Sequence, residues 1–149
     1  MNDPLVRLCG YLLQRAASSA LAELNLRLAP LGLRHAGVAL LMLIEARPGI
    51  TQSQAGRTLD IQRANMVPFV ARLEGLGVIR RRQVDGRSQA LELTSRGRLL
   101  LERARRVVAV HEAELLERVP EKLRPMVRPV LMALWLAEAE AAAAPGSGH

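Results

Sequence analysis

The chain has 149 residues, the length of one domain, and its net charge of +7 together with a pI near 11.3 favours an anionic partner. Half of the residues are hydrophobic but only 2% are aromatic, so the apolar mass is Leu, Ala and Val and the predicted fold class is mainly α. The single Cys excludes an intramolecular disulfide and a cysteine-based zinc site.

The sequence offers no sign of a membrane protein or of an enzyme. It has no run of about 18 uncharged apolar residues, and its first residues lack the basic-then-apolar layout of a signal peptide. It also lacks G-x-S-x-G, H-E-x-x-H and the glycine-rich phosphate motifs, and its three His are far apart. We therefore expect a cytoplasmic protein with no enzymatic activity, no cofactor, no metal and no membrane partner.

Two helices are predicted before residue 50. Apolar residues recur at helical spacing over residues 4–28, which predicts a long amphipathic helix ended by Pro30 and Gly32. Residues 34–47 are apolar almost all round, which is typical of a helix at the centre of a core. His35 begins this second helix, either as a surface residue of its first turn or as a polar group in a ligand cavity.

Residues 51–77 read as two helices joined by a turn. Thr51 and Gln54 have the spacing of a capping box, so a helix begins near residue 52. After a break at residues 59–61, apolar side chains at Val67, Val70, Leu73 and Leu76 line one face of a second helix, which Gly75 and Gly77 end.

Pro68 lies inside the second of these helices. It has no N–H to donate, and its ring crowds the carbonyl of Ala64. We expect a bend or a loosened first turn that still leaves residues 62–66 at an exposed edge.

A β-hairpin follows. Residues 78–83 and 90–94 are extended runs that bracket Asp85-Gly86-Arg87, a turn signal because Gly tolerates a positive φ. Residues 51–94 are therefore predicted to form a winged helix-turn-helix.

The C-terminal third is predicted to be helical. A helix over residues 95–119 has Thr94 or Ser95 as its cap, and His111 on it is expected at an interface or partly exposed. Pro120, Pro125 and Pro129 predict an irregular segment before residue 130 and a regular helix over residues 131–140. We expect residues 141–144 to fray and residues 145–149 to form a disordered tail.

The positive charge is concentrated in the winged segment. Residues 51–98 hold nine Arg against four acidic residues, so this third of the chain carries +5 of the +7. One exposed Arg is commonplace on any small helical domain, but this concentration indicates DNA binding.

The chain resembles the MarR family of bacterial transcription regulators. The matching motifs are residues 62–67 (QRANMV), residues 72–77 (RLEGLG) and the wing from residue 84 to Gly97, in which D-x-R is followed by S-x-A-L-x-L-T-x-x-G. The resemblance covers nearly the whole chain, because helical segments flank the motif in the family's order.

This resemblance implies a six-helix, MarR-like intertwined dimer. Residues 4–30 and 120–144 would be the dimerisation helices, residues 34–98 the DNA-binding lobe and residues 95–119 the long helix that links them. The two terminal segments carry more apolar residues than a lone small domain can cover. The expected interface anchors are Leu5, Leu8, Leu12, Leu131, Leu134 and Trp135.

The expected DNA contacts come from the two helices of the motif and from the wing. They are Ser53, Gln54, Gln62, Arg63, Ala64, Asn65, Met66, Arg72, Arg81, Arg82, Asp85, Arg87 and Gln89. Arg63 and Asn65 have bidentate geometries for guanine and adenine edges. The Asp85 carboxylate is expected to hold Arg87 extended for a minor groove.

The predicted function is a sequence-specific repressor of a pseudo-palindromic operator, released by a small effector of unknown identity. The resemblance implies an amphipathic, often aromatic, anion, for which Arg15, Ser19 and His35 are the polar groups nearest the expected crevice. One alternative is a non-specific architectural DNA-binding protein. Another is a peroxide sensor acting through Cys9, but Tyr11 is the only Tyr beside it, and we expect Cys9 to be buried and unreactive in the second turn of its helix.

Overall fold

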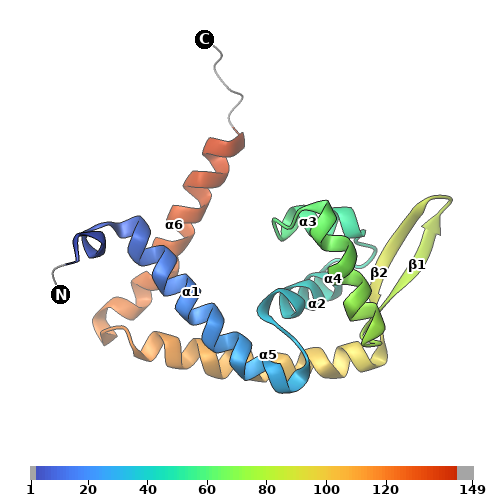
Figure 1. The fold of residues 1–149 in the computed structure, drawn as a ribbon, viewed down its shortest axis with the longest axis horizontal. Coiled ribbons are helices and arrows are strands. Elements are labelled where there is room, and N and C mark those ends of the chain that lie inside the picture. Colours follow the sequence, from blue (N-terminus) through green and yellow to red (C-terminus); the bar gives the residue numbers. More distant parts are fainter. Residues whose placement is uncertain (1–2, 144–149) are drawn as a thin grey trace, which may run out of the picture. The chain divides into compact units, whose positions relative to one another are not determined.

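The computed structural model describes residues 3–143, with side chains described through residue 137. The elements in chain order are the 3-10 turn η1 (Pro4–Arg7), α1 (Cys9–Leu28), the 3-10 turn η2 (Ala29–Leu31), α2 (His35–Ala46), α3 (Gln52–Thr58), α4 (Arg63–Gly75), β1 (Ile79–Asp85), β2 (Ser88–Leu93), α5 (Ser95–Glu117), the 3-10 turn η3 (Glu121–Leu123) and α6 (Arg124–Ala143) (Figure 1). The predicted fold class, mainly α with one hairpin, is confirmed. The chain divides into two compact units, and the boundary falls within α5 after His111.

The core of the first unit is built around α2. Leu40, Leu41 and Ile44 of this helix are buried, and α2 contacts α1, α3 and β2. Leu28 of α1 and Val70 of α4 belong to the same cluster. Burial of each large aliphatic side chain contributes about 1.5–3 kcal/mol. The central helix predicted over residues 34–47 is therefore confirmed, and it holds the winged motif against α1.

The first predicted helix is interrupted near its start. Pro4–Arg7 forms a 3-10 turn, because the Oδ1 of Asp3 accepts from the Leu5 N–H at 2.9 Å. Leu8 is extended, with φ of −95° and ψ of 113°, so α1 begins only at Cys9.

The prediction of a buried Cys9 in a second helical turn is wrong. Cys9 is exposed and is the first residue of α1. The physical reason is that α1 reaches the core only near its end, through Leu24 and Leu28. Its earlier apolar side chains, including Leu12, are exposed on the single chain.

α4 runs continuously from Arg63 to Gly75 with Pro68 inside it. Pro68 is the sixth residue of the helix, where it removes one backbone hydrogen bond without ending the helix. Gly77, with φ of +71°, stops the chain from continuing as a helix, as predicted.

α5 begins at a side-chain cap and carries a buried histidine. The Thr94 Oγ1 accepts from the Gly97 N–H at 3.0 Å, so Thr94 is the cap. His111 is 2% exposed and follows Leu101 and Ala104 along the buried face of the helix. The prediction of an interface or partly exposed His111 is therefore wrong for the single chain.

In the second unit, α6 begins earlier than predicted. Pro125 is the second residue of α6, a position where Pro is tolerated because no helical carbonyl awaits its N–H, and Pro129 lies inside the helix. The Arg124 side chain donates to the carbonyls of Val119 at 2.9 Å and Glu117 at 3.2 Å, where α5 ends. Residues 141–143, predicted to fray, belong to α6, and the predicted tail 145–149 lies outside the described residues.

No single helix among the described residues is long and apolar enough to cross a membrane. One pair passes the same test by length and composition alone, Cys9–Leu31 with His35–Ala46, and it is bent by 73°.

Candidate nucleic-acid interface

Residues 51–75 fold as a helix-turn-helix. The Thr51 Oγ1 accepts from the Gln54 N–H at 3.3 Å, and the Gln54 side chain accepts from the Thr51 N–H at 3.0 Å, so the predicted capping box is confirmed. Asp60 makes the turn in the left-handed region, with φ of +53°. The helices approach closely at Gly56, where a Cβ would lie 2.9 Å from the Met66 Cγ.

The first turn of α4 presents polar side chains to solvent. Gln62, Arg63, Ala64 and Asn65 are exposed. Gln62 and Arg63 line a cavity of about 440 Å³ between α3 and α4, together with Gln52, Ser53, Gly56, Arg57, Asp60, Ile61 and Met66. This edge of the motif is therefore accessible to a ligand from solvent.

Two predictions within α4 are wrong by one residue. Met66, predicted to contact DNA, is 1% exposed because it packs beneath α3 at Gly56. Val67, predicted to face the core, is 53% exposed. The buried face is Met66, Val70 and Leu73 rather than the series that begins at Val67.

Arg72, also predicted to contact DNA, lies at the other end of the helix. It is nine residues beyond Arg63, which corresponds to about 13 Å along the helix axis. It lines a separate cavity with residues of α1.

The wing is an antiparallel hairpin with an irregular tip. Arg81 pairs with Leu91, Gln83 with Gln89 and Asp85 with Ser88, and the register shifts between Gln83 and Asp85. Such a shift increases local twist. A bridge between Thr51 and Ala90 ties the hairpin to the start of α3.

The tip differs from its prediction in two respects. Gly86 is not among the residues with positive φ, so the turn does not use the freedom for which Gly was invoked. Within residues 3–143, no hydrogen bond or ion pair joins the Asp85 carboxylate to Arg87. Instead, the Gln83 side chain donates to the Asp85 carbonyl at 3.0 Å, and the Gln89 side chain donates to the Gln83 side chain at 3.4 Å. Arg87 is exposed at this tip.

Arg81 at the base of the wing joins three elements. Its Nε donates to the Glu74 Oε1 of α4 at 3.1 Å, and its Nη2 donates to the Gln52 Oε1 of α3 at 2.8 Å. These bonds use two of the five N–H donors of a guanidinium that the sequence assigned to DNA. In this structure Arg81 therefore connects the wing to both helices of the motif.

Arg80 and Arg82 lie on the opposite face of the hairpin, because side chains alternate along a strand. Both pair with Glu92 of β2, Arg80 through its Nε at 3.2 Å. The two arginines and Glu92 also line a cavity of about 240 Å³ with Arg98 and Glu45. Arg82, predicted to contact DNA, thus has an internal acidic partner.

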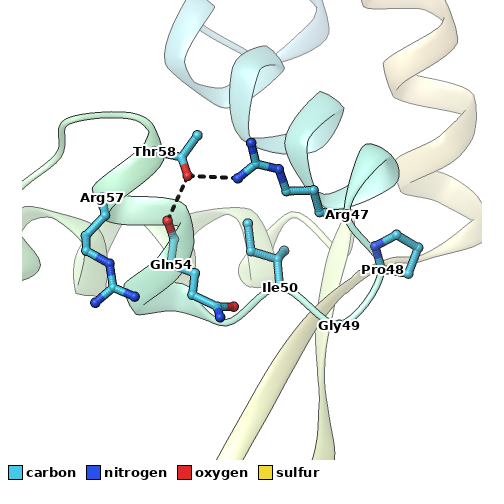
Figure 2. A pocket seen from close by; sticks show the side chains of 7 residues that line it. All are labelled: Arg47, Pro48, Gly49, Ile50, Gln54, Arg57 and Thr58. Atoms are coloured by element: carbon cyan, nitrogen blue, oxygen red, sulfur yellow. Dashed lines mark hydrogen bonds between the residues drawn. The ribbon is translucent and has the colours of Figure 1, made fainter. Parts of the chain in front are cut away.

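A polar cavity of about 420 Å³ lies where α2 leads into α3, and the sequence did not single it out. Figure 2 shows the Arg47 and Arg57 side chains beside Gln54 and Thr58. The Arg47 Nη1 donates to the Thr58 Oγ1 at 3.1 Å, and that hydroxyl donates to the Gln54 carbonyl at 3.1 Å. The sequence signal for this cavity is that Gln54 and Arg57 lie three residues apart, about one helical turn, on the helix predicted from residue 52.

The three predicted effector residues do not form one cluster of side-chain contacts. Arg15 and Ser19 are exposed on α1, one turn apart. His35 is half-buried, and the Asn25 Oδ1 accepts from its backbone N–H at 2.8 Å and lies 3.0 Å from its Nδ1. His35 is therefore both a first-turn residue and part of a polar contact to α1.

All six predicted interface anchors are exposed on the single chain. On α6 they are accompanied by Met126, Val130 and Leu136, and Trp135 is 64% exposed. Monomeric proteins rarely expose contiguous apolar patches larger than a few hundred Å².

No family model matches the chain. Among curated proteins, it is 32% identical over 112 residues to the HTH-type transcriptional repressor Rv2887 of Mycobacterium tuberculosis, a match that covers 74% of this chain and 81% of that protein.

Solved structures of transcriptional repressors match nearly the whole chain. CouR bound to a 23-mer DNA duplex is 35% identical with a TM-score of 0.82, and the match covers 87% of this chain and 94% of that one. CouR bound to p-coumaroyl-CoA is 34% identical with a TM-score of 0.82, covering 90% and 96%. The MarR family protein Rv2887 of Mycobacterium tuberculosis in complex with salicylic acid is 29% identical with a TM-score of 0.70, covering 89% and 98%.

Proposed function

The chain belongs to the MarR family of transcription regulators, and on that premise we propose that it is a repressor that binds a pseudo-palindromic operator as a homodimer and releases it when a small organic anion binds. The observation that carries this proposal is the exposed start of α4, with Arg63 and Asn65, on the same lobe as the exposed Arg87 of the wing. The protein would act in the cytoplasm as a regulator without enzymatic activity.

In this proposal the start of α4 enters a major groove. Arg63 would read guanine and Asn65 adenine, since their side chains match those base edges. Further polar groups would bind the DNA phosphates. They are the side chains of Ser53, Gln54, Gln62 and Gln89, and the backbone of Ala64. Arg87 would enter the adjacent minor groove, where A·T-rich steps concentrate negative potential.

The proposed dimer uses the terminal segments. Residues 4–30 and 120–144 would pair with those of a second copy, residues 34–98 would form the DNA-binding lobe, and residues 95–119 would connect them. The exposed apolar side chains of η1, α1 and α6 support this arrangement. Light scattering at micromolar concentration should give twice the 16.3 kDa of one chain, and the mass of a single chain would contradict the proposal.

Small-molecule release is supported by two relatives. CouR has been solved with p-coumaroyl-CoA and Rv2887 with salicylic acid, both of which are organic anions at neutral pH with an aromatic ring. We propose an effector of the same chemistry for this chain.

Selection of bound duplexes from a random DNA pool tests the function directly. We expect an enriched sequence with two inverted half-sites about one helical turn apart. A pool that stays random while the protein still binds DNA would favour the alternative, a non-specific architectural protein.

The exposure of Cys9 makes a second function, release by peroxide, testable. A sensing thiol needs groups that stabilise its thiolate, and no hydrogen bond or ion pair among the described residues involves the Cys9 thiol. We therefore expect Cys9→Ser to leave DNA release by organic peroxides as it is in the parent protein. Peroxide-triggered release that disappears in Cys9→Ser would establish Cys9 as the sensor.

A further inference from the structure

α4 carries apolar side chains on two faces. Its buried face is Met66, Val70 and Leu73. Four other apolar residues of the same helix are exposed at a spacing of three or four, so they lie along one side of it. We call them the α4 strip, and they are Ala64, Val67, Pro68 and Ala71. A single exposed apolar side chain is ordinary on a protein surface, but four at this spacing form a continuous strip.

The α4 strip is not covered by the part of the chain whose side chains are described. Val67, which is 53% exposed, belongs neither to the hydrophobic core cluster nor to the partly buried side chains packed against it, and the same holds for Pro68. Pro68 also has no N–H, so it offers no backbone hydrogen-bond donor on this side of the helix. A partner that fits the strip therefore presents apolar groups to it.

Positive charge borders the α4 strip. Arg63 is exposed, has no partner in the described structure and precedes Val67 by four residues, about one turn along the same side of the helix. Glu74 is the one acidic residue of α4, and its carboxylate accepts from Arg81. The strip thus fits a ligand whose apolar groups lie between anionic edges. The major groove of DNA has this arrangement, because the C5-methyl group of thymine lies in the groove between two phosphate backbones.

We propose that Val67 is a specificity-determining residue that packs against the C5-methyl group of a thymine in each half-site of the operator, with Pro68 beside it. The inference rests on the proposed function, in which the start of α4 enters a major groove and Arg63 reads guanine. Val67 lies about 6 Å beyond Arg63 along the helix axis, which corresponds to about two base-pair steps. The thymine is therefore expected within about two base pairs of that guanine.

A methyl contact differs physically from the contacts of the arginines. It removes apolar surface from water and releases no counterion, so its effect on the binding constant does not depend on salt concentration. Burial of one methyl group corresponds to a change of about fourfold in Kd. A phosphate contact made by an arginine weakens as the salt concentration rises. Salt therefore separates the two kinds of contact.

Deoxyuridine substitution in the selected operator tests the contact. Deoxyuridine lacks only the C5-methyl group of thymidine and keeps its base pairing. The thymines of one half-site are replaced one at a time, and Kd is measured by gel-shift titration with the full-length protein. We expect one replacement near the guanine to raise the Kd of the parent by about fourfold at low and at high salt. The same replacement should leave the Kd of Val67→Ala unchanged.

Val110→Ala is the matched control, because Val110 of α5 is also 53% exposed and lies outside the winged motif. This variant should keep the fourfold effect of deoxyuridine. Circular dichroism should show the helical content of the parent in both variants, since both side chains are exposed.

Two outcomes would overturn the role of Val67 and leave the repressor assignment standing. One is a selected operator in which no deoxyuridine replacement weakens binding, and the other is a replacement that weakens the parent and Val67→Ala equally. A pool that stays random would instead refute the sequence-specific repressor, and the proposed role of Val67 with it.

Discussion

Arginines lie at both the tip and the base of the wing, but their side-chain contacts differ. At the tip, Arg87 is exposed and has no hydrogen-bonding or ionic partner among residues 3–143. At the base, Arg80 and Arg82 pair with Glu92, and Arg81 is bonded to Glu74 and Gln52. The start of α4 resembles the tip, since Arg63 is exposed and has no partner in the described structure.

This contrast separates arginines whose side chains are free to bind DNA from arginines whose side chains already bind other residues of the chain. A guanidinium already paired with a carboxylate must give up that partner before it binds phosphate, so its net contribution to DNA affinity is smaller. A free guanidinium releases counterions from DNA without that cost. The net positive charge of residues 51–98 therefore overstates the number of arginines that bind.

The largest effect is expected at the tip. Arg87→Ala should weaken operator binding by about 1.5–3 kcal/mol, the size of a charge-assisted hydrogen bond, while the fold persists. Gel-shift titration at fixed salt measures the loss. Unchanged affinity would mean that the wing does not reach DNA.

The same titration examines Asp85. Because the Asp85 carboxylate does not hold Arg87 in this structure, the effects of Asp85→Ala and Arg87→Ala on operator affinity should add in the double variant. A double variant no weaker than Arg87→Ala would show that the two side chains become coupled on DNA.

The start of α4 should give the next largest effect, and it should depend on sequence. Arg63→Ala is expected to cost about 1–3 kcal/mol on the selected operator and to relax the base preference at one position of each half-site. The comparison uses the operator and a scrambled duplex of the same length. Equal losses on both would assign Arg63 to phosphate contacts only.

Arg81 should show an intermediate, indirect effect. Arg81→Gln breaks the link between β1 and α4, so it should reduce operator affinity by less than Arg87→Ala does. Glu74→Gln, which leaves the arginine in place, should reproduce most of the loss, and the double variant should be no weaker than Arg81→Gln. If Glu74→Gln instead has no effect or strengthens binding, Arg81 contacts DNA directly.

The smallest effect is expected at Arg80. Its partner is on the neighbouring strand and the Arg80 side chain is 68% exposed, so Arg80→Gln should change both stability and operator affinity by less than about 0.5 kcal/mol. Thermal unfolding and the gel-shift titration measure the two quantities. A loss as large as that of Arg87→Ala would remove the distinction between tip and base.

Local signals in the sequence predicted the winged motif well. The capping box at Thr51, the stop at Gly77 and the hairpin around Asp85 all depend on neighbouring residues, and the structure places each element where those signals indicated. The family, and with it the DNA-binding function, followed from the same stretch.

Errors arose where the outcome depends on distant contacts. Periodicity alone could not choose between Met66 and Val67 for the buried face, because the close approach of α3 at Gly56 decides it. Arg81 and Gln52 are 29 positions apart in the sequence, and no sequence pattern near either residue predicts their hydrogen bond. The burial of His111 and the exposure of Cys9 likewise follow from which turns of α5 and α1 meet the core.

The salt dependence of operator affinity distinguishes the arginine at the tip of the wing from those at its base. The logarithm of the binding constant is measured against the logarithm of salt concentration for the parent, Arg87→Gln and Arg80→Gln. Each lost phosphate contact lowers the magnitude of the slope by about 0.9. We expect a slope of smaller magnitude for Arg87→Gln, by about that amount per protomer, and an unchanged slope for Arg80→Gln. Equal changes in the two variants, or a change in Arg80→Gln alone, would contradict it.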